Sequence, residues 1–66
     1  MSASVPRLFA DIKAMLEDMH AVAVEGQCCD NSPDMQLALT RLLRSRTATV
    51  EASLVIIAHR LGGEHD

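Results

Sequence analysis

Aromatic residues are almost absent from this sequence, which contains one phenylalanine and no tyrosine or tryptophan. This scarcity argues against aromatic stacking platforms for single-stranded nucleic acid, and against most β-sandwiches and β-barrels. Glycine and proline are also few, at three and two residues, so little of the chain can form turns. Because apolar residues make up 48% of the 66 residues, the composition predicts one small folded domain, residues 1–66, rather than a disordered chain.

Long hydrophobic runs are absent as well. The longest apolar run covers residues 54–58, far short of the roughly 20 residues that span a bilayer. The first residues lack the charged and apolar regions of a secretory signal. The two cysteines, Cys28 and Cys29, are adjacent, a spacing at which a mutual disulfide is strained. We therefore expect a cytoplasmic protein without a membrane partner.

Helical spacing of apolar residues dominates the first third of the chain. From Val5 to Ala23 they recur at steps of three and one, which places them within one arc of roughly 140° on a helix. Ser4 can cap the start, Pro6 suits a first turn, and Gly26 suits the position just after a helix end. The pattern predicts a helix over residues 5–25.

A second helix is predicted over residues 33–61. Residues 26–32 form a turn-rich loop, after which Ser32 can cap the helix and Pro33 can take its first position. Residues 45–50 contain several weak helix formers, so a break there, giving three helices, is the alternative. Residues 62–66 should form a frayed tail. The prediction is an all-α, antiparallel two-helix hairpin.

The lengths of the two predicted helices differ by about two turns. If residue 25 lies beside residue 33, residue 5 lies near residue 53, and the more hydrophobic end of the second helix overhangs the first. This end is apolar on nearly all sides, which is typical of a helix buried on all sides. We therefore expect another chain, identical or different, to cover it. Simple exposure of Val55 and Ile56 is the alternative.

Charge is distributed unequally between the two predicted helices, with a net of −2 on the first and +2 on the second. This complementarity favours their pairing. Arg46 falls inside the apolar stripe of the second helix. It is either a side chain that reaches to solvent from the edge of the stripe, or a buried or interfacial charge that sets register or partner choice.

Catalytic and metal-binding patterns are weak. Adjacent cysteines at a loop do not match the spacing of zinc ligands, and His20 and His59 read as surface residues. There is no glycine-rich phosphate loop, and a small hairpin lacks a natural pocket for a small-molecule substrate. Arg41 and Arg44 share a face that Arg46 does not, so the sequence does not predict the continuous basic surface that nucleic-acid binding needs. We expect no enzyme activity and no cofactor.

One family resemblance concerns the end of the second helix. Residues 51–63, with their Glu-Ala-Ser start, Ile-rich centre, His59 and glycine stop, resemble the end of the small co-chaperones of type III secretion needle subunits. Those proteins are helical hairpins of similar length. The resemblance implies a larger helical-repeat chaperone as partner. It covers about 13 of the 66 residues, and the early, longer loop departs from that family's pattern.

Protein–protein interaction is therefore the predicted function, as an adaptor or co-chaperone that binds through the apolar face and the overhanging end of the second helix. The alternative is a homodimeric four-helix-bundle regulator, which could bind RNA. The residues predicted to bind the partner are Leu37, Arg46, Leu54, Val55, Ile56, Ile57 and Leu61.

Overall fold

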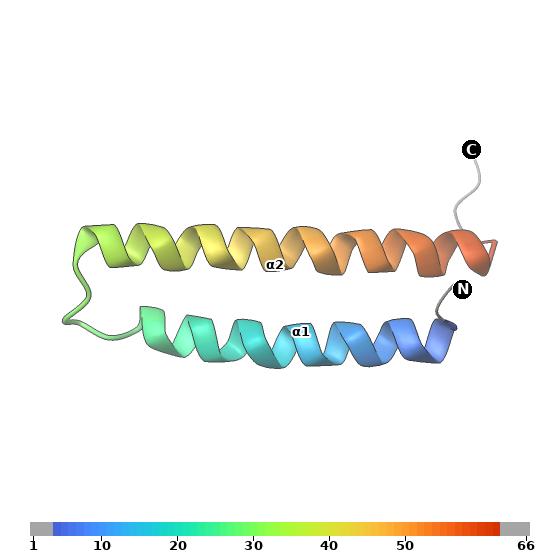
Figure 1. The fold of residues 1–66 in the computed structure, drawn as a ribbon, viewed down its shortest axis with the longest axis horizontal. Helices are drawn as coiled ribbons and strands as arrows, with labels where there is room; N and C mark the ends of the chain where they lie inside the picture. The colour runs from blue at the N-terminus through green and yellow to red at the C-terminus, as the bar shows by residue number, and fades with distance from the viewer. Residues whose placement is uncertain (1–3, 63–66) are drawn as a thin grey trace.

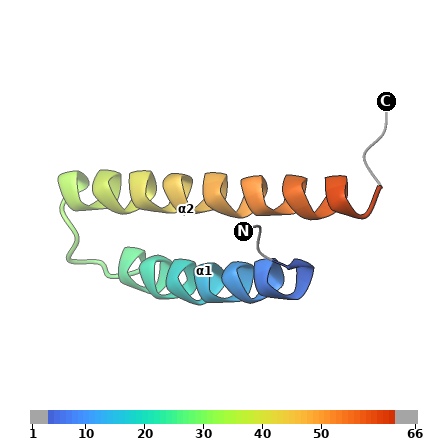
Figure 2. The ribbon, with the colours of Figure 1, turned by 45° about the vertical axis from the view of Figure 1, so that its right-hand side comes forward.

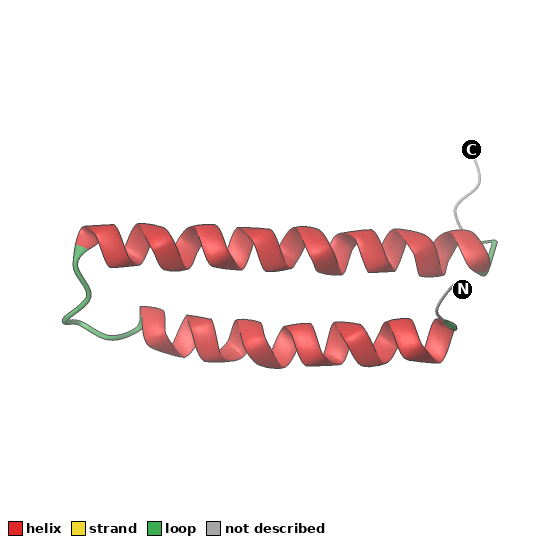
Figure 3. Ribbon diagram, in the orientation of Figure 1, coloured by secondary structure: helices red, strands yellow, loops and turns green. Residues whose placement is uncertain are grey.

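The hairpin consists of two antiparallel helices in this computed structural model, which describes residues 4–62 (Figure 1). Helix α1 covers Val5–Gly26 and helix α2 covers Pro33–Arg60. They lie side by side in both views (Figures 1 and 2), and within the described range the remaining residues are loop or turn (Figure 3). The predicted all-α hairpin is confirmed. Most of the predicted frayed tail, residues 63–66, lies outside the described range.

The same serine-based device starts both helices. The Ser4 hydroxyl accepts a hydrogen bond from the backbone N–H of Arg7 at 3.2 Å, and Ser32 accepts one from Met35 at 3.1 Å. Each bond satisfies a backbone donor that has no partner within the helix. A proline in the first turn then supplies a preset φ at no cost in hydrogen bonds.

Helix α2 continues through its weak segment, so the three-helix alternative is wrong. Thr47 and Thr49 each donate their hydroxyl to the carbonyl four residues earlier, which satisfies these side chains within the helix. The expectation for Gly26 is also wrong. Gly26 is the last residue of α1, and Gln27 caps that helix in a right-handed conformation. Gly62, with φ of 74°, takes the left-handed position after α2.

The hydrophobic core lies between the helices at the end far from the loop. Leu8 and Ile12 of α1 pack with Ile57 of α2, and Val5 and Val50 lie against this cluster. Ile57 is the most deeply buried of them, at 5% exposure. Among the described residues only Val22 is also buried, so the hairpin on its own has a thin core.

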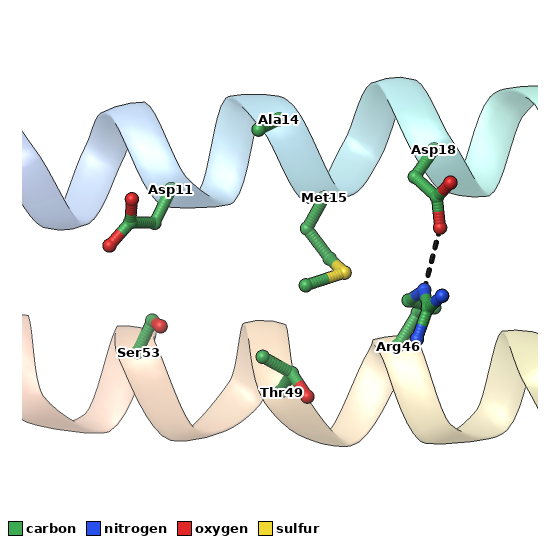
Figure 4. Close-up of a pocket in the computed structure, with 7 residues that line it drawn as sticks. All are labelled: Asp11, Ala14, Met15, Asp18, Arg46, Thr49 and Ser53. Carbon is green, nitrogen blue, oxygen red and sulfur yellow. Dashed lines mark hydrogen bonds and ion pairs between the residues drawn. The ribbon is translucent and has the colours of Figure 1, made fainter.

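The register of the hairpin differs from the prediction. Asp18 pairs with Arg46, Asp11 faces Ser53 (Figure 4), and Leu8 shares a cluster with Ile57. Carried to the helix ends, this register places Val5 opposite about residue 59 and Gly26 opposite about residue 38.

The expected overhang of about two turns at the C-terminal end of α2 is therefore wrong. The loop advances along the helix axis before α2 begins, so α2 extends past α1 at both ends (Figure 1). About one turn of the extra length lies beside the loop, and the residues from Leu54 to Ile57 lie opposite α1.

Replacement of Ile57 by alanine is expected to lower the free energy of unfolding by about 2–5 kcal/mol, because it leaves a cavity between Leu8 and Ile12. Val55→Ala, on the exposed back of α2, should change it by less than about 0.5 kcal/mol. Urea unfolding followed by circular dichroism measures both. Equal losses for the two variants would contradict the core described here.

Candidate interaction surface

Large apolar side chains remain exposed on both helices. Phe9 and Leu16 of α1 are each 52% exposed, although they directly follow Leu8, which is buried, and Met15, which is half-buried. On α2, Leu54 is 43% exposed and Leu61 is more exposed still. Single exposed apolar residues are ordinary on a protein surface, whereas a continuous patch of them marks an interaction site.

Seven-residue spacing aligns these side chains along each helix. On α1 the series is Phe9, Leu16 and Ala23, and each member directly follows a residue that points toward α2. On α2 the equivalent series is Thr40, Thr47, Leu54 and Leu61. Residues seven apart complete nearly two full turns, so each series forms a stripe beside the contact line of its helix.

Both stripes lie on the same side of the hairpin. In two right-handed antiparallel helices, a step of one residue from the contact line rotates each helix toward the same side. Phe9 follows Leu8 and Thr40 follows Leu39 in this way. A shallow groove supports the placement, because Ala23 of α1 and Thr40 of α2 line it together. We call the surface formed by the two stripes the apolar face.

The threonines of the apolar face present little free polarity. The Thr40 hydroxyl donates to the Gln36 carbonyl at 2.8 Å, and the Thr47 hydroxyl donates to the Leu43 carbonyl at 2.9 Å. Since both donors are satisfied within α2, covering them would not leave an unpaired hydroxyl proton. The apolar face can therefore be buried along its length without that penalty.

The opposite side of the hairpin is a polar groove of about 530 Å³ (Figure 4). Asp18 and Arg46 face each other across it, with the Arg46 Nε 2.6 Å from the Asp18 carboxylate. Because these charges neutralise each other, the groove presents no strong field to a ligand. The residues that line it are Asp11, Ala14, Met15, Asp18, Arg46, Thr49 and Ser53.

Reactive side chains are scattered rather than gathered. Cys28 and Cys29 are exposed in the loop, His20 is exposed on α1, and His59 is exposed on α2. No group of three or more His, Cys, Asp or Glu residues within positions 4–62 could hold a metal ion. Neither described helix is long and apolar enough to cross a membrane.

The residues predicted to bind a partner do not lie on one surface of the hairpin. Leu54 and Leu61 lie on the apolar face, whereas Leu37 and Val55 lie on the back of α2, and Ile56 precedes Ile57 toward the polar groove. The inclusion of Ile57 is wrong, because its side chain is buried within the hairpin.

The Arg46 side chain is only about a third exposed and pairs with Asp18. This fits the alternative in which Arg46 sets register, although the register is that of the two helices within one chain.

Phe9 and Leu16 were missed as candidate surface residues. Sequence periodicity assigned them to the core because they fall in the same arc as Leu8 and Ile12. The available signal was the width of that arc, since about 140° is more than a single neighbouring helix covers.

Comparison of the chain with protein-family models, with curated proteins and with solved structures finds no match.

The Asp18–Arg46 ion pair is expected to contribute about 0.5–1 kcal/mol, because it joins the two helices but is partly exposed to solvent. A double-mutant cycle with Asp18→Asn and Arg46→Gln, read by urea unfolding, measures this coupling. The value should fall as sodium chloride screens the charges. A coupling of zero at low salt would mean that the pair does not help to hold the register.

Proposed function

We propose that this chain is a protein-interaction module, which packs its apolar face against helices of another chain. The observation that carries the proposal is the alignment of Phe9, Leu16, Leu54 and Leu61 on one side of the hairpin. Leaving such side chains in water forgoes about 1.5–3 kcal/mol each relative to full burial. A hairpin with so thin a core gains a large share of its stability by covering them.

The total accessible surface supports the same proposal. The chain exposes 5207 Å², whereas a compact monomer of 7.2 kDa is expected to expose about 4,100 Å². The excess of roughly 1,000 Å² resembles what one partner contributes to a standard protein–protein interface, about 800 Å². Packing by interdigitated Leu, Phe and Thr side chains would be the mechanism of binding.

The proposal is for binding rather than catalysis, because the reactive cysteines and histidines of the described residues do not converge. A protein partner is favoured over nucleic acid, since Arg46 is held by Asp18 and α1 is acidic. A helical-repeat chaperone, as implied by the resemblance of residues 51–63, is one partner that such a face would suit. A second copy of the chain is another.

Site-specific photocrosslinking tests the proposal in cells that naturally contain the chain. With p-benzoylphenylalanine in place of Leu54, covalent protein adducts are expected, because this position would lie inside the interface. The matched control replaces Ile56, which is equally exposed at 43% but lies roughly 200° around the same helix. Adduct yield should be several-fold higher at position 54. Equal yields at the two positions would contradict an interface on the apolar face.

A further inference from the structure

We propose that a second copy of this chain covers the apolar face, related by a two-fold axis parallel to the helices. In this dimer α1 of each copy packs against α2 of the other, and all neighbouring helices are antiparallel. The inference rests on the proposed function, because it names the occupant of the same face. Three features of the described residues support it: size, charge and level along the axis.

Side-chain size along the apolar face changes in the same direction on both helices. On α1 it falls from Phe9 through Leu16 to Ala23 toward the loop, and on α2 the loop half carries threonine where the other half carries leucine. A two-fold axis parallel to the helices preserves level, so large residues of one copy meet large residues of the other. The alternative axis, perpendicular to the helices, would place the large end against the small end and leave gaps.

The register determines which residues of the two helices lie at the same height along the helix axis. Asp11 is level with Ser53, and Asp18 is level with Arg46 (Figure 4). By the same register Phe9 is level with about residue 55, so in the proposed dimer it packs against Leu54 of the second copy. The proposed contact thus joins the largest exposed apolar side chain of α1 to the most apolar part of α2.

Charges at the margins of the face are complementary in this arrangement. Lys13 lies at the outer margin beside Phe9 and Leu16, and Glu51 follows Val50 at the outer margin of α2. The two margins meet between copies, and the register places Lys13 level with Glu51 of the second copy.

Glu17 does not extend this match, because it is level with about residue 47 of the second copy, one turn from Arg44. Within residues 4–62, Glu51 has no ion-pair partner, so it is available to pair with Lys13 of the second copy. A perpendicular axis would instead stack α1 on α1, and both carry a net charge of −2.

Charge exchange tests the dimer with purified full-length protein. Lys13→Glu and Glu51→Lys should each weaken the homodimer by about tenfold, because two symmetry-related ion pairs become repulsive. Mixing the two variants restores both pairs, so native mass spectrometry should find roughly nine-tenths of the dimer as the mixed species. Random mixing, which gives half, would overturn the two-fold arrangement.

Two controls accompany the exchange. A Glu25→Lys variant should mix with the wild type at random, because Glu25 lies on the side of α1 that carries the polar groove, away from the proposed contact. Circular dichroism of Lys13→Glu checks that loss of its pair with Glu17, now 3.3 Å long, has not unfolded α1.

The native cysteines provide a second, independent measurement. A spin label on Cys28 in a Cys29→Ser variant reports where the two loops lie in the dimer. A parallel axis puts both loops at one end, with a label separation of roughly 20 Å, whereas a perpendicular axis separates them by about the 42 Å length of α2. A separation near the longer value would overturn the proposal.

Failure of this inference can be told from failure of the proposed function. A chain that stays monomeric, yet forms adducts with a different protein through position 54, would overturn the dimer and leave the interaction module standing. Absence of position-54 adducts of any kind would overturn both.

Discussion

A helix that lies beside a single neighbour can hide only one side of itself, and this limit governs the hairpin. Leu8, Ile12 and Ile57 fill the one contact that two helices can make. The apolar arc of α1 is wider than that contact, and its remainder, with Phe9 and Leu16, faces solvent. On α2 the exposed stripe lies on the same side. The two helices thus share a second, uncovered line of apolar residues next to the core.

The helices could be predicted from the sequence because local chemistry determines them, whereas the register between them could not. Ser4 and Ser32 cap the two starts through the hydrogen bonds that their sequence positions imply, so both starts could be read directly. The path of the loop depends on how the helices pack, which periodicity does not contain. The prediction assumed a tight turn, which placed residue 5 opposite residue 53 rather than about residue 59. This difference of about six positions produced the expected overhang and left Ile57 without a neighbour on α1, whereas the structure buries it.

Only part of the candidate surface, its α2 side, could be predicted from the sequence, for a related reason. Periodicity finds an arc on each helix, but the direction of that arc relative to the other helix requires the register and the handedness of the pair. Leu54 was found because its segment is strongly apolar, and Phe9 was overlooked because it resembles a core residue. Val55 and Ile56 belong to the same apolar segment, but they lie on other sides of α2 than the apolar face. Composition located the segment, and geometry selects among its residues.

The threonines of the apolar face affect both the stability of α2 and the proposed binding. In a helix interior threonine lowers helix propensity, and leucine at positions 40 and 47 would hold α2 together better on propensity alone. Their hydroxyls bond to the preceding turn, at Gln36 and Leu43, so each presents a methyl group and a satisfied donor to the face. Leucine there would enlarge the loop half of the face, where α1 offers only Ala23. Threonine therefore keeps that half narrow while still allowing it to be covered, and in the proposed interface it would leave the bulk of the contact to the end where Phe9 and Leu54 lie.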